Sequence, residues 1–94
     1  MKRPVLKSTL LSVYPNPSSA SDIMNLDVFS VSAGESMSIV IRDLPGRELY
    51  RQTAELVKGS NRVTLSMPKP ELRGIFFIEV SNPGFREIRK LIIK

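Results

Sequence analysis

The chain has 94 residues, a formal net charge of +5, and no Cys, His or Trp. A chain of this length forms one modest hydrophobic core, so we predict a single domain. The missing residue types exclude a histidine-based catalytic triad, a cysteine nucleophile, a thiolate zinc site and a disulfide framework.

Three of the five net positive charges lie at the start of the chain, where Lys2, Arg3 and Lys7 have no acidic residue near them. A nucleic-acid-binding domain keeps its basic excess on the folded surface, so we do not expect nucleic acid as a partner. No long apolar stretch follows Met1, so we expect the chain as given to carry no secretory signal of its own. The apolar runs are also far shorter than the roughly 20 residues of a membrane-spanning helix.

Residues 1–8 lack any apolar alternation, and we predict a flexible leader there. From residue 9 to residue 94 we predict one domain, because apolar and polar residues alternate with a period of two, as in half-buried strands. The sequence predicts no helix and seven strands, at residues 9–14, 22–30, 36–43, 47–55, 61–67, 74–81 and 85–93. Seven short strands at this spacing indicate an antiparallel β-sandwich, with a small barrel as the alternative.

Two of the breaks between these strands have the sequence of a type II turn. Residues 44–47 read Leu-Pro-Gly-Arg and residues 82–85 read Asn-Pro-Gly-Phe. A type II turn favours Pro at its second position and needs a positive φ at its third position. We therefore predict a positive φ at both Gly46 and Gly84.

Two strands leave the inward-facing residues undecided. In the strand 47–55, either Leu49 or Tyr50 could point into the core. In the strand 85–93, Ile88 and Ile92 share one face while Leu91 and Ile93 share the other. A β-bulge, or burial of both faces, would reconcile this second pattern.

The acidic residues give no indication of catalysis. Asp43, Glu48, Glu79 and Glu87 are scattered, and most occupy turns or outward strand positions. The chain has no glycine-rich phosphate loop and no oxygen-rich spacing typical of a calcium loop. We therefore predict no enzymatic activity, no metal and no cofactor.

Four short motifs follow one another along the chain. Val-Tyr-Pro-Asn-Pro occupies residues 13–17, and Asp-Leu-Pro-Gly-Arg occupies residues 43–47. Leu-Arg-Gly-Ile-Phe begins a strand at residues 72–76, and the basic and apolar segment Arg-Lys-Leu-Ile-Ile-Lys occupies residues 89–94. Each motif alone is a weak signal, but their order and spacing together are specific.

This ordered series resembles the type A C-terminal sorting domains of type IX secretion cargo, and the resemblance covers about residues 9–94. Family members show Tyr-Pro-Asn-Pro, an Asp-x-x-Gly-Arg or Lys turn, Leu-x-x-Gly-x-Tyr and a basic-apolar last strand. Here Phe76 replaces the usual Tyr, and Pro45 stands in the turn. The matching residues are Tyr14, Pro15, Asn16, Pro17, Asp43, Gly46, Arg47, Leu72, Gly74, Phe76, Arg89, Lys90 and Lys94.

The resemblance implies a seven-stranded antiparallel immunoglobulin-like β-sandwich that acts as a non-catalytic secretion signal. Its N-terminal cargo would cross the periplasm, and an outer-membrane translocon or shuttle would recognise the domain. The protein would then reach the outer membrane and cell surface or be secreted, where a sortase-like peptidase usually removes the domain. The alternative is a generic immunoglobulin-like or fibronectin-like accessory or adhesion module of a larger protein.

Several motif residues also have simpler structural interpretations. Asp43 and Gly46 suit turn chemistry, in which a carboxylate accepts backbone N–H groups and a glycine adopts a positive φ. Gly74 suits a close approach of the chain at the start of a strand. Arg89, Lys90 and Lys94 lie on the last strand, where they are either solvated charges or recognition residues at a sheet edge.

The alternation also predicts an interaction face. If Phe76 points inward, then Phe77 and its outward neighbours place apolar side chains on the opposite face of the sheet. A charged rim of Arg42, Glu79, Arg89 and Lys90 would surround them, as at a partner site or a weak homodimer contact. The alternative is that Phe77 points inward or that a loop covers the face. The candidate interaction face consists of Val40, Ile75, Phe77 and Ile92.

Overall fold

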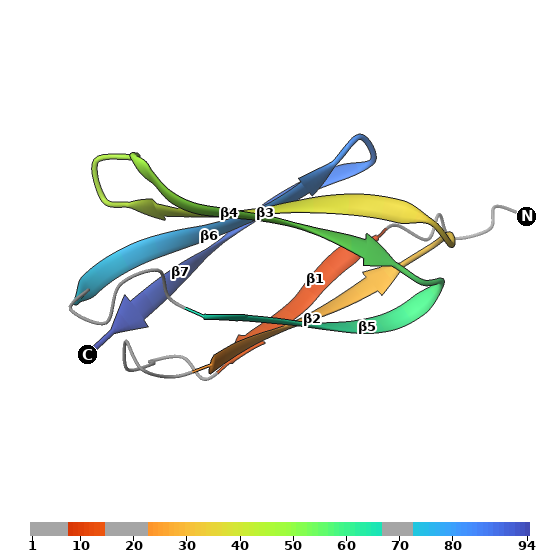
Figure 1. The fold of residues 1–94 in the computed structure, drawn as a ribbon, viewed down its shortest axis with the longest axis horizontal. Helices are drawn as coiled ribbons and strands as arrows, with labels where there is room; N and C mark the ends of the chain where they lie inside the picture. Colours follow the sequence, from red (N-terminus) through yellow and green to blue (C-terminus); the bar gives the residue numbers. More distant parts are fainter. Residues whose placement is uncertain (1–7, 15–22, 67–72) are drawn as a thin grey trace, which may run out of the picture.

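The computed structural model describes residues 8–14, 23–66 and 73–94, and these form two antiparallel sheets that pack face to face (Figure 1). One sheet has the strand order β1-β2-β5 and the other has the order β4-β3-β6-β7. None of the described segments is a helix long and apolar enough to cross a membrane. The strands are β1 (Thr9–Tyr14), β2 (Ile23–Ser30), β3 (Glu35–Asp43), β4 (Glu48–Leu56), β5 (Gly59–Ser66), β6 (Gly74–Asn82) and β7 (Phe85–Ile93).

The strand order is that of an immunoglobulin-like sandwich. Strands β3, β6 and β7 share one sheet, and β4 joins that sheet beside β3 rather than crossing to β2 and β5. Immunoglobulin-like domains vary in the placement of their fourth strand, which belongs to one sheet in some of them and to the other sheet in others. The prediction of an all-β antiparallel sandwich is therefore confirmed. Among the described strands no pairing joins the two sheets, so the barrel alternative is wrong.

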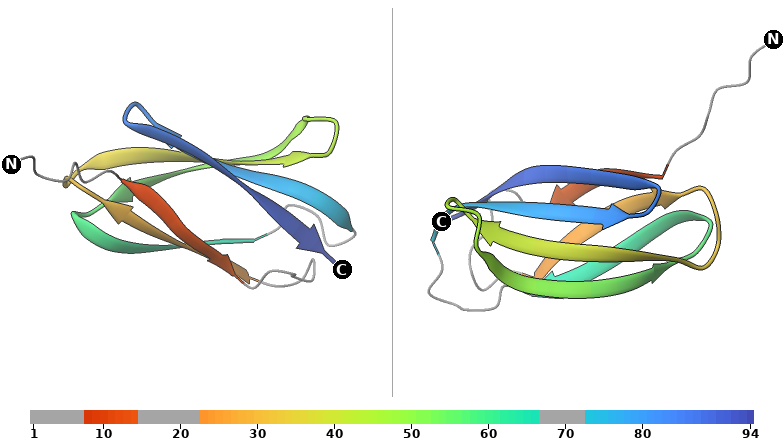
Figure 2. Two further views of the ribbon diagram at one scale, coloured as in Figure 1. Left: turned by 180° about the vertical axis from the view of Figure 1, so that it is seen from behind. Right: turned by 90° about the horizontal axis from the view of Figure 1, so that it is seen from above.

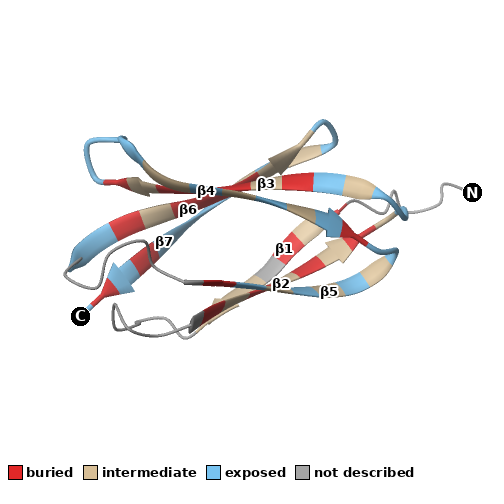
Figure 3. Cartoon of the chain, in the orientation of Figure 1, coloured by how far each residue is buried: buried red, intermediate tan, exposed pale blue. Residues whose placement is uncertain are grey.

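The core lies between the sheets because the predicted alternation turns one side of each strand inward. In Figure 3 buried and exposed residues alternate along the strands for this reason. Phe76 is 5% exposed and points inward, so the neighbouring Phe77 is on the outer face. The buried apolar residues include Met24, Leu26 and Val28 of β2, Met37, Ile39 and Ile41 of β3, Ile78 and Val80 of β6, and Leu91 and Ile93 of β7.

Strand β7 presents apolar side chains to both of its faces. Its register against β6 runs without a shift from residue 74 to residue 82, so the β-bulge that we considered is absent from it. Leu91 and Ile93 are buried, whereas Ile88 is 49% exposed and Ile92 is 37% exposed. The outer face of this sheet therefore carries exposed aliphatic residues at its β7 edge.

A β-bulge settles the orientation of the β4 residues. Tyr50 lies opposite Ile41, and Glu48 lies opposite Arg42, so the register shifts between these two pairs. Leu49 is the extra residue of the bulge. Both Leu49 and Tyr50 are partly buried against the core, so neither alternative alone was correct.

The turn between β3 and β4 starts one residue earlier than predicted. The Asp43 carbonyl accepts a hydrogen bond from the Gly46 amide at 2.9 Å, and the Asp43 amide donates to the Arg47 carbonyl at 3.0 Å. The loop therefore has three residues, with Gly46 in the left-handed region at φ +98°. The positive φ is confirmed, whereas the type II assignment with Pro45 in second position is wrong.

The turn between β6 and β7 does not have the predicted backbone. Gly84 lacks the positive φ that a type II turn requires. The Asn82 side-chain oxygen instead accepts hydrogen bonds from the Gly84 amide at 2.7 Å and the Phe85 amide at 3.1 Å. This side-chain turn holds the hairpin without a left-handed residue.

Ser8 is part of the folded structure, although we assigned it to the leader. It is 9% exposed, and its hydroxyl accepts a hydrogen bond from the Val31 amide at 3.1 Å. The domain therefore extends at least one residue further toward the N-terminus than predicted. The rest of the predicted leader, residues 1–7, lies outside the described residues.

The start of β1 and the C-terminus lie at opposite ends of the sandwich (Figures 1 and 2). Ser8 enters at the end that also carries the β2–β3 and β6–β7 turns. The opposite end carries the C-terminus, the β3–β4 turn and the last residue of β1.

Candidate functional site

The described parts of the four motifs converge at the end of the sandwich that carries the C-terminus. Tyr14 ends β1, and Asp43 lies opposite Phe76 where β3 ends. Gly74 begins β6 and pairs with Ile93 at the end of β7. We call this region the motif end (Figure 2). The motif residues Pro15, Asn16, Pro17 and Leu72 lie outside the described residues.

At the motif end, Asp43 and Arg47 close the β3–β4 turn. One Asp43 carboxylate oxygen accepts the Arg47 amide at 2.7 Å, and the other accepts the Arg47 Nε at 2.8 Å. Burial raises the pKa of Asp43, but these bonds from Arg47 outweigh burial and lower the pKa overall. Asp43 therefore has a structural task in the turn, while the Arg47 side chain remains 79% exposed to a partner.

Gly74 is required for its backbone conformation rather than for space. Its φ is +113°, a backbone angle that residues with a Cβ rarely adopt. A Cβ placed on Gly74 would meet no atom within 4 Å. The prediction of a close chain approach at this residue is therefore wrong.

Tyr14 belongs to a polar cluster on the outer face of the three-stranded sheet. Its hydroxyl lies 3.4 Å from an Asp27 carboxylate oxygen that also accepts the Arg62 Nε at 3.2 Å. The Arg62 guanidinium lies 5.6 Å from the centre of the Tyr14 ring, which adds a cation–π contact. Asp27 and Arg62 were missed by sequence analysis, although both occupy outward positions of their strands.

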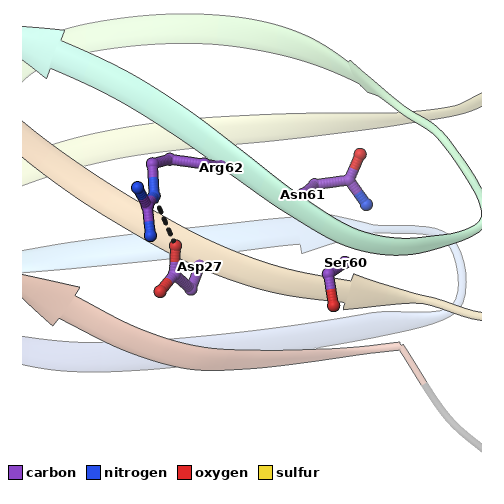
Figure 4. Close-up of a pocket in the computed structure, with 4 residues that line it drawn as sticks. All are labelled: Asp27, Ser60, Asn61 and Arg62. Carbon is purple, nitrogen blue, oxygen red and sulfur yellow. Dashed lines mark hydrogen bonds and ion pairs between the residues drawn. The ribbon is translucent and has the colours of Figure 1, made fainter.

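A hollow of about 390 Å³ adjoins this cluster and is lined by Asp27, Ser60, Asn61 and Arg62 (Figure 4). The figure shows Arg62 reaching across to Asp27 from the neighbouring strand. Because the Asp27 carboxylate already accepts hydrogen bonds from Arg62 and Tyr14, its task is to fix the last residue of β1. Tyr14 therefore has a structural role in this cluster.

The predicted interaction face lies on the outer side of the four-stranded sheet. Ile75 and Ile92 are paired across β6 and β7 and are 43% and 37% exposed. Phe77 is half-buried between Arg42 and Lys90 of the neighbouring strands. Three of the four predicted face residues therefore contribute to this surface.

Val40 is the exception, since it is only 4% exposed. Its register places it on the outer face, between Arg51 of β4 and Glu79 of β6. Flanking side chains of this length cover a short Val, which alternation alone does not show. Ile88, and not Val40, contributes to the exposed surface. It pairs with Glu79 across β6 and β7, and it is 49% exposed.

Glu79 organises the charges on this face. Its side chain is 10% exposed and forms ion pairs with Arg42 at 3.2 Å and with Arg86. The bond from Arg86 chiefly lowers the pKa of Glu79, against the opposing effect of burial, and Arg42 adds to the lowering. The carboxylate therefore stays charged at neutral pH and holds the two guanidinium groups in place.

Beside this ion-pair cluster lies a groove of about 290 Å³, which we call the outer-face groove. It reaches from the ion pairs to the β3–β4 turn, and Leu44 of that turn is 65% exposed. Sequence analysis missed Leu44 and Ile88 as surface residues. The groove is lined by Arg42, Asp43, Leu44, Gly46, Phe77, Glu79, Arg86 and Ile88.

The basic residues of β7 divide between two faces. The Arg89 guanidinium donates to the Leu10 carbonyl at 3.1 Å and lies 3.9 Å from Glu87. Arg89 therefore joins β7 to β1, and its predicted place in the rim of the interaction face is wrong. Lys90 pairs with Phe77 on the outer face, and Lys94 is exposed beyond the end of β7.

Glu35 forms a second cluster that the sequence did not reveal, at the end where Ser8 enters. Its carboxylate accepts hydrogen bonds from Ser30 at 2.8 Å, Ser32 at 3.0 Å and Ser8 at 3.1 Å. The Asn82 amide lies 3.4 Å from the same group. The bonds from Ser30 and Ser32 chiefly lower the pKa of Glu35.

Replacing Glu35 by Gln should reduce thermal stability at neutral pH and much less in acid. A carboxylate whose pKa is lowered by folding stabilises the protein above its unfolded pKa, and this stabilisation is lost as the pH falls through the folded pKa. The difference in melting temperature between the wild type and Glu35→Gln should therefore be largest near pH 7 and shrink below about pH 4. Thermal unfolding across this range measures it, with Glu55→Gln on β4 as the control; a constant difference would contradict the expectation.

Replacing Phe77 by Ser should cost less than about 1 kcal/mol of unfolding free energy, because the residue lies on the outer face. It should weaken partner binding or export, since it removes the largest apolar side chain from the outer-face groove. Chemical denaturation and a reporter export assay measure the two effects. Phe76→Ser is the matched control and should destabilise more, since Phe76 is 5% exposed. A loss of about 3 kcal/mol for Phe77→Ser would identify it as a core residue instead.

Among the described residues, no group of three or more Asp or Glu side chains is arranged to hold a metal ion.

Comparison with known protein families identifies one that matches most of the chain. Residues 12–94 match the family described as the secretion system C-terminal sorting domain. No curated protein and no solved structure matches the chain. The matched range contains all four motifs and every described strand from the middle of β1 onward.

Proposed function

The chain belongs to the family of type IX secretion system C-terminal sorting domains, and we propose that it delivers an N-terminally attached cargo across the outer membrane. The family match over residues 12–94 carries this proposal. The cargo would pass through the periplasm and then reach the cell surface or be secreted. An outer-membrane translocon or shuttle would bind the folded domain, and a sortase-like peptidase would remove it at the surface.

The arrangement of the termini supports recognition at the motif end. Strand β1 begins at the opposite end of the sandwich (Figure 2), so we place the attached cargo at that end. The exposed Arg47 side chain and the outer-face residues Ile75, Ile88 and Ile92 then stay accessible to the secretion machinery. Residues 1–7 would act as the leader between cargo and domain.

We also propose that the domain has no catalytic task, because three of its described acidic residues, Asp43, Glu79 and Glu87, have structural tasks. Asp43 holds Arg47 in a turn, and Glu79 holds Arg42 and Arg86 on the sheet surface. Glu87 accepts hydrogen bonds from β1. A partner peptidase would therefore supply the chemistry of processing.

A reporter export assay tests the proposal. A periplasmic reporter fused upstream of residues 1–94 should appear at the cell surface of a bacterium with a type IX system. The same reporter without the domain should stay in the periplasm. Periplasmic retention of the folded fusion would contradict the proposal and favour the accessory-module alternative. Mass spectrometry of the surface reporter would show whether the domain is removed or retained.

A further inference from the structure

The outer-face groove lies on the four-stranded sheet, on the surface that faces away from the other sheet. Figure 1 shows the two sheets packed face to face. Phe77 and Ile88 belong to neighbouring strands at the groove's β6–β7 side, and Leu44 lies at its turn side. Ile88 is 49% exposed and Leu44 is 65% exposed, so a bound side chain could bury both. Burial of this kind of surface provides binding free energy in proportion to area.

Arg42 and Arg86 line the groove, and ion pairs with Glu79 hold both side chains in place. Glu79 binds the Nε groups of Arg42 and Arg86 through different carboxylate oxygens, and Arg42 also donates to the Gly46 carbonyl at 3.3 Å. A guanidinium has five N–H groups, more than these bonds use. The side chains are 36% and 67% exposed, so both can meet a ligand. Asp43, which also lines the groove, is paired with Arg47, so Arg42 and Arg86 together with Glu79 leave one net positive charge beside the apolar surface.

We propose that the outer-face groove binds an extended partner segment that presents acidic and apolar side chains on the same face, at every second position. This inference rests on the proposed function and names the chemistry of the partner. Carboxylates pair with arginine through two parallel hydrogen bonds, and arginines that are already held in place lose less entropy on binding. Side chains two residues apart in an extended segment point to the same face, so an acid placed two residues from an apolar residue faces the groove together with it.

A second copy of the chain fits the groove less well. A two-fold dimer would place the same surface on both sides of the contact, so Arg42 and Arg86 of each copy would meet the same arginines. Like charges opposed in this way disfavour the contact. A flat lipid surface also fits less well, because the apolar part of the site is a hollow beside an ion-pair cluster.

Binding of two synthetic peptides to the isotope-labelled chain tests the proposal by NMR. One peptide has Glu, Leu, Glu and Phe at every second position with Ser between them, and the other has Lys in place of Glu. The acidic peptide should shift amide signals of β3, β6 and β7 around the groove in a saturable way, and the basic peptide should not. Arg86→Glu should weaken binding at least tenfold. Arg62→Glu is the matched control and should bind normally, since Arg62 is also ion-paired and 66% exposed but lies on the opposite sheet.

Ile88→Ser provides a second variant that leaves the ion pairs intact, and it should also weaken binding. Absence of saturable binding to the folded wild type would overturn the proposal, as would an equal loss in Arg62→Glu. Self-association abolished by Arg86→Glu in sedimentation would assign the groove to a second copy. Binding to anionic vesicles without peptide binding would assign it to the membrane. If the reporter is exported although no peptide binds, the groove proposal fails while the sorting function stands.

Discussion

Replacing Gly46 by Val is expected to lower the free energy of unfolding by about 1–3 kcal/mol. Gly46 has a φ of +98°, where a β-branched residue is strongly disfavoured. A Cβ at this position would meet no atom within 4 Å, so the cost comes from the backbone and not from a clash. The Gly46 amide also closes the turn on the Asp43 carbonyl at 2.9 Å, and a shift in φ would disturb this bond.

The matched control for Gly46→Val is Leu44→Val in the same turn. Leu44 is 65% exposed and has no positive φ, so the same new side chain should cost little there. Urea unfolding of the three proteins measures the difference. Equal midpoints for Gly46→Val and the wild type would contradict the assigned strain. Since Leu44 and Gly46 both line the outer-face groove, the stability measurement must precede any interpretation of binding.

The strands and the inward faces were predictable because they depend on local alternation. Burying one side of a strand forces a period of two, and this pattern placed Ile39 and Ile78 in the core before the fold was known. The same logic placed Ile75 and Phe77 outside. Turn geometry was less predictable, because the Asn82 side chain supplies an acceptor that replaces the left-handed Gly84 of a type II turn.

Side-chain clusters between distant strands could not be predicted from alternation. Glu35 binds Ser8 across 27 residues, and Glu87 binds Thr9 across 78 residues. Glu35 is in phase with the buried Met37, and Glu87 is in phase with the buried Leu91, but their partners lie on strands that are distant in the sequence. Burial of Val40 also depends on long side chains of neighbouring strands, and the pairing of those strands is known only from the fold.

Replacing Glu87 by Ala should also destabilise the fold by about 1–3 kcal/mol, through loss of an acceptor for β1. The Leu10 amide donates to the Glu87 carboxylate, and the Leu10 carbonyl accepts from Arg89 at 3.1 Å. These two side chains bind the outer edge of β1, where no further strand of the sheet pairs. Leu10 is 2% exposed, so water replaces the lost bond poorly.

Hydrogen exchange at the Leu10 amide distinguishes this local effect from general destabilisation. In Glu87→Ala, exchange at Leu10 should accelerate more than exchange in β3 and β6. Glu55→Ala, on an exposed position of β4, should change stability by less than about 0.5 kcal/mol and leave Leu10 unaffected. Unchanged exchange at Leu10 in Glu87→Ala would contradict the assigned bond. The contacts of Glu87 and Arg89 therefore hold the outer edge of β1 to the sandwich.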